Sequence, residues 1–146
     1  MEINIKKLHE DSIIPTRGSE EAAGYDLYAY LEDEKIDLNP GETKMIGTGI
    51  AVEIPTGYFG AIYARSGIAA KRNLRPANCV GVIDSDYRGE IKVPLYNDSD
   101  KVQSLDNKER VAQLVIMPYL NVTFNEVENL SESNRDQGGF GSTGTK

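Results

Sequence analysis

Short runs of alternating apolar and polar residues, each closed by a turn, constrain the fold of this chain more than any other feature. Such alternation is typical of half-buried β-strands. It recurs in residues 3–5, 25–29, 36–38, 50–54 and 58–64, and residues 110–116 form a nearly continuous apolar run. A continuous run indicates a strand buried on both faces. Roughly ten short strands with turns between them predict an all-β fold, either a jelly-roll or a distorted barrel of the β-clip type.

The chain offers little helix, and its carboxyl-terminal segment is polar. Residues 68–71 are expected to form one or two helical turns, and Val122 and Phe124 form the last expected strand. From residue 129 onward almost no apolar residue remains, so this segment cannot form a core. We therefore predict a single β domain over residues 1–128 and a flexible tail over residues 129–146. Fully extended, the chain from Phe124 to Phe140 spans about 50 Å, so the tail can reach another subunit.

Composition excludes several classes of function. The 146 residues carry a formal net charge of −7, which argues against a general nucleic-acid or anionic-membrane binder. Cys79 and His9 are the only residues of their types, so one chain can build neither a disulfide framework nor a Cys/His zinc site. We expect Cys79 to be a small buried residue. No run approaches the ~20 apolar residues of a membrane helix, and residues 1–9 lack the core of a signal peptide, so we expect a cytoplasmic protein.

The stretch Gly81–Gly89 is the strongest candidate for a ligand site. Apolar residues lead up to Ile83, a polar turn follows, and residues 91–95 alternate again, which predicts a β-hairpin. Backbone groups near such a turn can bond a flat polar ring, while Tyr87 offers a stacking face and Asp84 a base. The same short polar residues are also ordinary turn formers, so this pattern alone leaves both interpretations open.

Three further polar features of the sequence are candidates for a functional site. Arg65-Ser66-Gly67 follows an expected strand and forms either an anion seat or a simple helix cap. Gln113 and Asp26 lie inside expected strands, and each needs a polar partner if it is buried.

A glycine-rich strip at residues 139–144 formally matches the Gly-x-Gly-x-x-Gly dinucleotide pattern. That pattern needs a preceding strand and a following helix, and neither is expected here, so we reject it. The strip, with Arg135 before it, could instead close over a phosphate chain with Phe140 covering a base. Disordered tail is the alternative that its composition favours.

Taken together, five segments resemble, in order, the five motifs of the trimeric dUTP pyrophosphatases (dUTPases). The segments are residues 22–27 (AAGYDL), 65–67 (RSG), 81–89 (GVIDSDYRG), 110–113 (RVAQ), and Arg135 with 139–144 (GFGSTG). The sequence departs from the family at Asn73, Lys108 and Asp136, where glycine is usual.

The resemblance implies hydrolysis of dUTP to dUMP and pyrophosphate, which keeps uracil out of DNA and supplies dUMP for thymidylate synthesis. Asp84 would deprotonate the water that attacks the α-phosphorus and would contact the 3′-hydroxyl. Tyr87 would pack on the deoxyribose and leave no room for a 2′-hydroxyl. The uracil edge would be read by Asn78 and by the backbone from Val80 to Lys92, including Gly81, Val82 and Ile83.

The resemblance also implies how the phosphates are held. The phosphate seat would consist of Arg65, Ser66, Gly67 and Gln113, with Asp26 behind it, tied to water or to an Arg. The tail clamp would consist of Arg135, Phe140, Gly141, Ser142 and Thr143, with Phe140 over the uracil and Arg135 on the γ-phosphate. Mg²⁺ would be bound mainly by the phosphates and water, with no dedicated protein site. The assembly would be a homotrimer with shared sites that binds neither nucleic acid nor membrane.

Two alternatives remain at this stage. A dCTP deaminase-like enzyme would need a carboxylate beside its Arg-Ser motif, and residues 68–70 are Ile-Ala-Ala. A catalytically silent nucleotide-binding module would use the same scaffold to recruit a protein partner.

Overall fold

The computed structural model describes residues 1–139, and this part of the chain contains twelve short strands and one short helix. The strands are β1 (Asn4–Lys7), β2 (Thr16–Arg17), β3 (Tyr25–Tyr28), β4 (Lys35–Leu38), β5 (Thr43–Gly47), β6 (Ile50–Glu53), β7 (Tyr58–Ala64), β8 (Leu74–Pro76), β9 (Gly81–Ile83), β10 (Lys92–Asn97), β11 (Gln103–Asp106) and β12 (Arg110–Pro118). The helix α1 (Ser66–Arg72) lies between β7 and β8. The prediction of an all-β fold with one short helix is confirmed.

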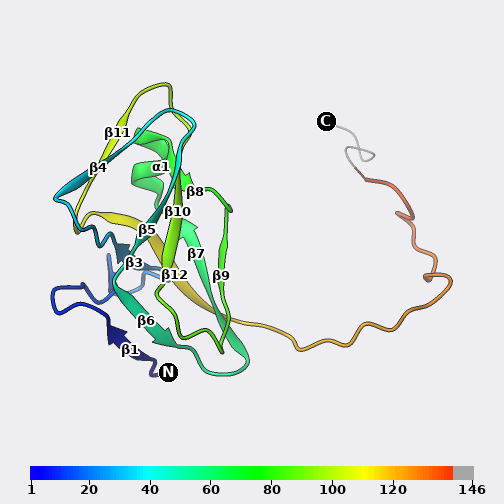
Figure 1. The fold of residues 1–146 in the computed structure, drawn as a ribbon. Helices are drawn as coiled ribbons and strands as arrows, with labels where there is room; N and C mark the ends of the chain where they lie inside the picture. The colour runs from blue at the N-terminus through cyan, green and yellow to red at the C-terminus, as the bar shows by residue number, and fades with distance from the viewer. Residues whose placement is uncertain (140–146) are drawn as a thin grey trace.

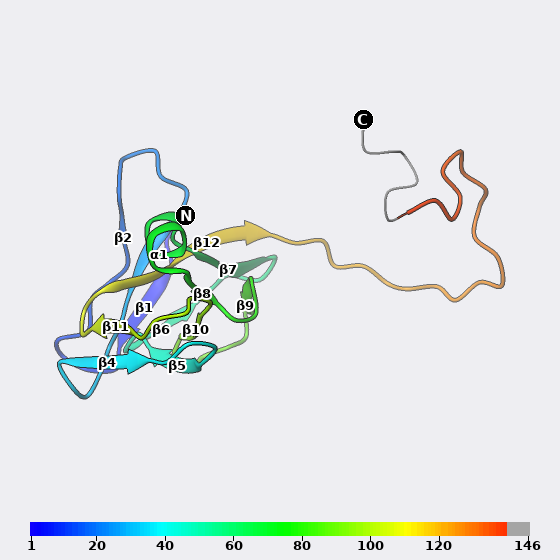
Figure 2. The same ribbon diagram turned by 90° about the horizontal axis from the view of Figure 1, so that it is seen from above.

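All strand pairs are antiparallel and form four small sheets. The largest has the order β2-β3-β12-β7-β9, a second has the order β5-β10-β8, and β1-β6 and β4-β11 are two-stranded. Figure 1 shows β4, β11 and α1 at one end of the barrel and β1 and β6 at the other. Seen from above in Figure 2, β12 runs past the body and continues into the carboxyl-terminal segment.

The core fills the space between these sheets with aliphatic side chains. Along β10 the side chains alternate as the sequence predicts, since Val93 and Leu95 are fully buried while Lys92 is exposed. Leu74 on the neighbouring strand β8 is also fully buried, and fully buried partners from the other sheets include Leu27, Leu38, Ile50, Leu105 and Val111. The end of β10 is fixed by the buried Asn97, whose amide donates to Leu38 O (2.9 Å) and Lys101 O (2.7 Å). Every sheet therefore contributes to one core.

The predicted hairpin over residues 81–95 is wrong. β9 pairs with β7, whereas β10 pairs with β5 and β8, so the loop of residues 84–91 crosses from one sheet to another. Two bonds to the β5–β6 region hold the end of this loop away from β9. Ile91 N donates to Ile50 O (2.9 Å), and Thr48 Oγ1 donates to Ile91 O (2.7 Å). Alternation reports which face of a strand is buried and leaves its partner open.

Two smaller predictions also fail. Val122 and Phe124 form no strand, and their side chains are 59% and 93% exposed, because the chain leaves the body after Pro118 (Figure 1). A strand requires a neighbour for its backbone groups, and the period-two signal of residues 122–124 does not supply one. Cys79 is exposed and not buried. It stands in a turn with φ 63°, where Cys79 N bonds Pro76 O, and a lone residue in a turn carries no periodic burial signal.

The three positions where the family usually has glycine share a backbone feature. Asn73, Lys108 and Asp136 adopt φ of 53°, 66° and 43°. This left-handed region favours glycine, is tolerated by Asn and Asp, and is costly for other side chains. Lys108 lies in the turn between β11 and β12, where its N–H donates to Ala29 O (2.9 Å). All three residues thus adopt a backbone conformation that glycine favours, and Lys108, which is neither Asn nor Asp, carries the largest strain of the three.

Replacing Lys108 with glycine should therefore stabilise the protein by about 0.5–1 kcal/mol. The variant loses an exposed ion pair with Asp11 (3.0 Å), which contributes little. The same change at Lys6, on strand β1 with ordinary φ, should destabilise by about 0.5–1 kcal/mol. Urea unfolding measures the free energy of unfolding of both variants. Equal and unfavourable effects of the two substitutions would show that Lys108 is not strained.

Candidate functional site

The loop of residues 84–91 overhangs a pocket of about 400 Å³. The pocket brings together six residues that the sequence analysis selected: Asn78, Val82, Ile83, Asp84, Tyr87 and Lys92. Gly81 is buried beside them, and a side chain there would crowd Ile62 Cβ at 3.2 Å and contact Asn78 Nδ2 at 3.5 Å. The pocket therefore combines an amide, a carboxylate, an aromatic ring and an ammonium group around a partly apolar floor.

The loop forms a compact turn. Tyr87 N donates to Asp84 O (3.1 Å), and the Tyr87 hydroxyl donates to Glu90 O (2.9 Å). Arg88 Nη1 donates to Ser85 O (2.6 Å) on the outer side. Asp84 is exposed at the rim, and Tyr87 is 44% exposed. A carboxylate and a ring are thus presented to solvent on one short, internally bonded turn.

Three further residues that sequence reasoning missed line this pocket: Met45, Glu90 and Pro94. Met45 comes from β5, and the β5–β10 register places it opposite Pro94. No local pattern near Met45 signals this position, because it follows from strand pairing between distant segments. Glu90 directly follows the selected stretch Gly81–Gly89, so its position in the sequence could have suggested it.

A second pocket, of about 510 Å³, lies behind Glu90 and Lys92. The His9 and Tyr30 rings stack there at 4.1 Å between centroids. The hydrogen bond from Lys108 lowers the pKa of Asp11, and partial burial, together with the charge of Asp11, raises the pKa of Tyr30. Met45, Glu90 and Lys92 line both pockets and form the wall between them.

A second cluster of selected residues gathers around Asp26. Arg65 Nε donates to Asp26 Oδ1 (2.6 Å), and Arg110 Nη1 donates to Asp26 Oδ2 (3.2 Å). The Asp26 side chain is 12% exposed, and two guanidinium groups compensate its buried charge. Within residues 1–139 the Arg65 side chain forms no other hydrogen bond, so its two terminal nitrogens remain as donors for an anion. The sequence analysis quoted Arg110 in a motif but gave it no role.

The residues around Arg65 add further donors. Arg65 is the N-cap of α1, with no side-chain capping bond, so the first backbone N–H groups of Ser66 and Gly67 lack helical partners. Gln113 pairs with Asp26 in the β3–β12 register and donates to Ala64 O (2.8 Å). A side chain at Gly24 would overlap the Gln113 oxygen. Backbone amides, a guanidinium group and an amide thus meet at one end of the five-stranded sheet.

The two clusters lie at opposite ends of β7. In the β7–β9 register Gly60 faces Ile83, so Asp84 stands beside Phe59, and these two residues line a common pocket of about 600 Å³. Arg65 follows the other end of the strand. Six residues at ~3.3 Å each put about 20 Å between Phe59 and Arg65. One copy of the chain therefore keeps Asp84 and Arg65 apart.

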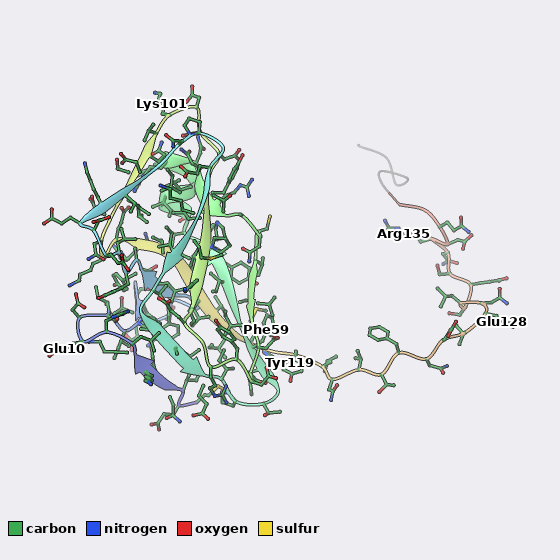
Figure 3. All side chains as sticks on the ribbon, in the orientation of Figure 1. Glu10, Phe59, Lys101, Tyr119, Glu128 and Arg135 are labelled. Atoms are coloured by element: carbon green, nitrogen blue, oxygen red, sulfur yellow. The ribbon has the colours of Figure 1, made fainter. Side chains whose placement is uncertain are left out.

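The tail residues are placed differently again. Arg135 lies on the extended segment far from the barrel (Figure 3), and its Nε donates to Gly138 O (2.7 Å). The selected residues Phe140, Gly141, Ser142 and Thr143 lie outside the described residues.

Within residues 1–139, no group of three His, Cys, Asp or Glu side chains is placed to hold a metal ion. None of the helices described there is long and apolar enough to cross a membrane.

Comparisons with known proteins point to one family. The sequence matches the dUTPase family over residues 10–144. Proteins called deoxyuridine 5′-triphosphate nucleotidohydrolase from Nautilia profundicola and Escherichia phage T5 are each 49% identical, with 99% of both chains covered. The solved structure of the Staphylococcus bacteriophage 80alpha dUTPase with dUpNHpp is similar with a TM-score of 0.88 at 30% identity, covering 98% of each chain.

The Asp26 cluster generates a prediction about stability. Asp26→Asn should destabilise the fold by about 1–3 kcal/mol, because it leaves two partly buried guanidinium groups without their carboxylate. The exposed pair Arg75 and Asp98, at 3.4 Å, provides a matched control. Asp98→Asn should change the stability by less than about 0.5 kcal/mol. Denaturant unfolding that gave both variants the same stability would contradict this account of Asp26.

Proposed function

Since this chain belongs to the dUTPase family, we propose that it hydrolyses dUTP to dUMP and pyrophosphate by attack of water on the α-phosphorus. The observation that carries the proposal is the pocket under residues 84–91, where Asp84, Tyr87 and Asn78 meet. The reaction keeps uracil out of DNA and supplies dUMP for thymidylate synthesis.

Asp84 is proposed as the general base. Its carboxylate is exposed at the pocket rim, where a water molecule and a phosphate can approach together. The carboxylate takes a proton from the water as the water oxygen bonds to the α-phosphorus, and the bond from that phosphorus to the bridging oxygen breaks. Pyrophosphate leaves with the electron pair. Such proton transfer typically contributes 10²–10⁴-fold to the rate.

The rest of the pocket is proposed to select the nucleoside. Tyr87 would cover the deoxyribose, and its ring would collide with a 2′-hydroxyl. Asn78 and the backbone of β9 and Lys92 would bond the uracil edge. Cytosine presents a donor where uracil has an acceptor, so its binding would leave buried groups unpaired, which is a strong form of discrimination.

The Arg65 cluster is proposed as the phosphate seat. Asp26 holds the Nε of Arg65, which leaves the terminal nitrogens to bind phosphate oxygens in a fixed orientation. Ser66, Gly67 and Gln113 supply further donors. In the tail, Arg135 would bind the γ-phosphate, and Phe140, Gly141, Ser142 and Thr143 would close over the nucleotide.

Magnesium is proposed as the cofactor. Hard divalent cations take oxygen ligands, and a triphosphate with water supplies them without a protein cage. Bound there, Mg²⁺ would offset the charge that develops on the phosphate oxygens.

A homotrimer with shared sites is proposed as the assembly. The separation of about 20 Å between Arg65 and Phe59, the neighbour of Asp84, supports sites built from more than one copy. The segment after β12 supports it further, since Leu120, Val122 and Phe124 are 86%, 59% and 93% exposed and need an apolar neighbour. An apolar hollow of about 430 Å³, lined by Ile3, Ile14 and Ile116 among others, offers one.

Pyrophosphate release from dUTP, UTP, dTTP and dCTP with Mg²⁺ tests the proposal. We expect release from dUTP at a kcat/KM far above those of the other three. Ammonia release from dCTP would revive a deaminase, and nucleotide binding without turnover would indicate a silent module.

Asp84→Asn is the control that assigns the activity to this pocket. Turnover should fall by about 10²–10⁴-fold while nucleotide affinity stays within about tenfold, because only the general base is removed. An unchanged rate would remove Asp84 from this role.

Deletion of residues 135–146 tests the tail. The truncated chain should keep the oligomeric state and thermal stability of the full chain, because the deleted residues follow the last core strand. Hydrolysis of dUTP should slow at least tenfold, the change that loss of one charged contact to phosphate produces. A truncated protein with full activity would show that the tail has no part in catalysis.

A further inference from the structure

The side chain of Glu90 ties the loop of residues 84–91 to the turn between β5 and β6. Its Oε1 accepts a hydrogen bond from Gly49 N (2.9 Å), and its Oε2 lies 3.3 Å from Lys92 Nζ. The Glu90 side chain is only 21% exposed. A bond from a backbone N–H to a largely buried carboxylate is stronger than a neutral one. The end of the loop is therefore fixed to a turn of a neighbouring sheet.

The backbone of Glu90 faces the other way and holds Tyr87. The Glu90 carbonyl oxygen accepts the Tyr87 hydroxyl at 2.9 Å, and this is the polar contact of that side chain within residues 1–139. Since Tyr87 is 44% exposed, packing alone does not fix its ring. The carboxylate and the carbonyl of one residue thus connect the ring to the rigid turn.

Two glycines leave the space that this arrangement needs. A side chain at Gly89 would lie 2.6 Å from Tyr87 Cζ, so the ring occupies the position that a larger residue would fill. A side chain at Gly47 would lie 2.6 Å from Glu90 Oε1. The Tyr87 ring packs against the backbone of Gly89, and the Glu90 carboxylate packs against the backbone of Gly47. Both positions therefore require that these residues have no side chain.

We propose that Glu90 is a positioning residue that fixes the Tyr87 ring and thereby sets the discrimination against ribonucleotides. This inference rests on the proposed function, in which the ring excludes the 2′-hydroxyl. Steric exclusion is only as strong as the resistance of the excluding group to movement. A ring released from Glu90 can turn aside at low cost and admit the extra hydroxyl.

Another residue supplies a matched control. Glu42 also accepts a backbone N–H, that of Asn39 at 2.7 Å, and also pairs with a lysine, Lys44 at 3.6 Å. Its side chain is 32% exposed, and it makes no contact with the loop. A purely structural role for such a carboxylate would affect Glu42→Ala and Glu90→Ala alike.

The test measures kcat/KM for dUTP and for UTP in Glu90→Ala, Glu90→Gln and Glu42→Ala, with thermal unfolding of each. In Glu90→Ala we expect the dUTP/UTP ratio to fall about five- to tenfold, the change that one lost hydrogen bond produces in an equilibrium constant. Glu90→Gln should restore most of the ratio, since its amide oxygen still accepts the Gly49 N–H. Glu42→Ala should leave the ratio unchanged at a similar thermal shift.

Two variants carry the test should Glu90→Ala not fold. Gly89→Ala displaces the ring directly, and Tyr87→Phe removes its hydroxyl bond, so each should lower the ratio by a similar factor. The double variant Tyr87→Phe/Glu90→Ala should lose no more than either single variant, because both break one connection.

The outcomes separate this inference from the proposed function. An active wild-type enzyme whose dUTP/UTP ratio stays within twofold in Glu90→Ala, or in both Gly89→Ala and Tyr87→Phe, overturns the role of Glu90 alone. A wild-type protein that releases no pyrophosphate from dUTP overturns the proposed function and this inference with it.

Discussion

The antiparallel pairing of β7 with both β9 and β12 is the constraint on which the rest of the structure depends. It sets Asp84 beside Phe59 at the start of β7, while the partnership with β12 sets Gln113 and Asp26 near the end that leads into Arg65. A seven-residue strand cannot bend back to join its own ends. In the proposed function, the carboxylate that activates water and the groups that bind phosphate therefore lie at opposite ends of one copy, and the proposed site forms where copies meet.

Two partly buried carboxylates organise these two halves in the same physical way. Asp26 is compensated by two guanidinium groups and orients Arg65. Glu90 is compensated by a backbone N–H and an ammonium group and holds the turn that carries Tyr87. Neither carboxylate is proposed to bind the nucleotide. A buried charge is stable only when its partners stay in contact with it. Each carboxylate therefore holds the groups that it contacts in one position.

Periodicity predicted the strands well and their partners poorly. The strand expected at residues 58–64 is β7 to the residue, and the burial of Val93 and Leu95 follows the alternation of β10. The hairpin expected over residues 81–95 failed because alternation carries no information on which edge a strand joins. Asp84 and Tyr87 were selected from the polar turn itself, and Asn78 and Lys92 through the family resemblance. Met45 enters the pocket only through the β5–β10 register. The left-handed turn at Lys108 was signalled by a missing glycine, and its strain only by the backbone angle.

Mixing two inactive variants tests the separation of the two halves most directly. Asp84→Asn and Arg65→Ala proteins would be unfolded, combined in equal amounts, refolded together and assayed for pyrophosphate release from dUTP. Sites shared between copies should recover about one quarter of the wild-type activity, because random assembly pairs an intact Asp84 with an intact Arg65 from a neighbour at about one site in four. A mixture as inactive as its two components would show that Asp84 and Arg65 serve the same site from one chain, which contradicts the account.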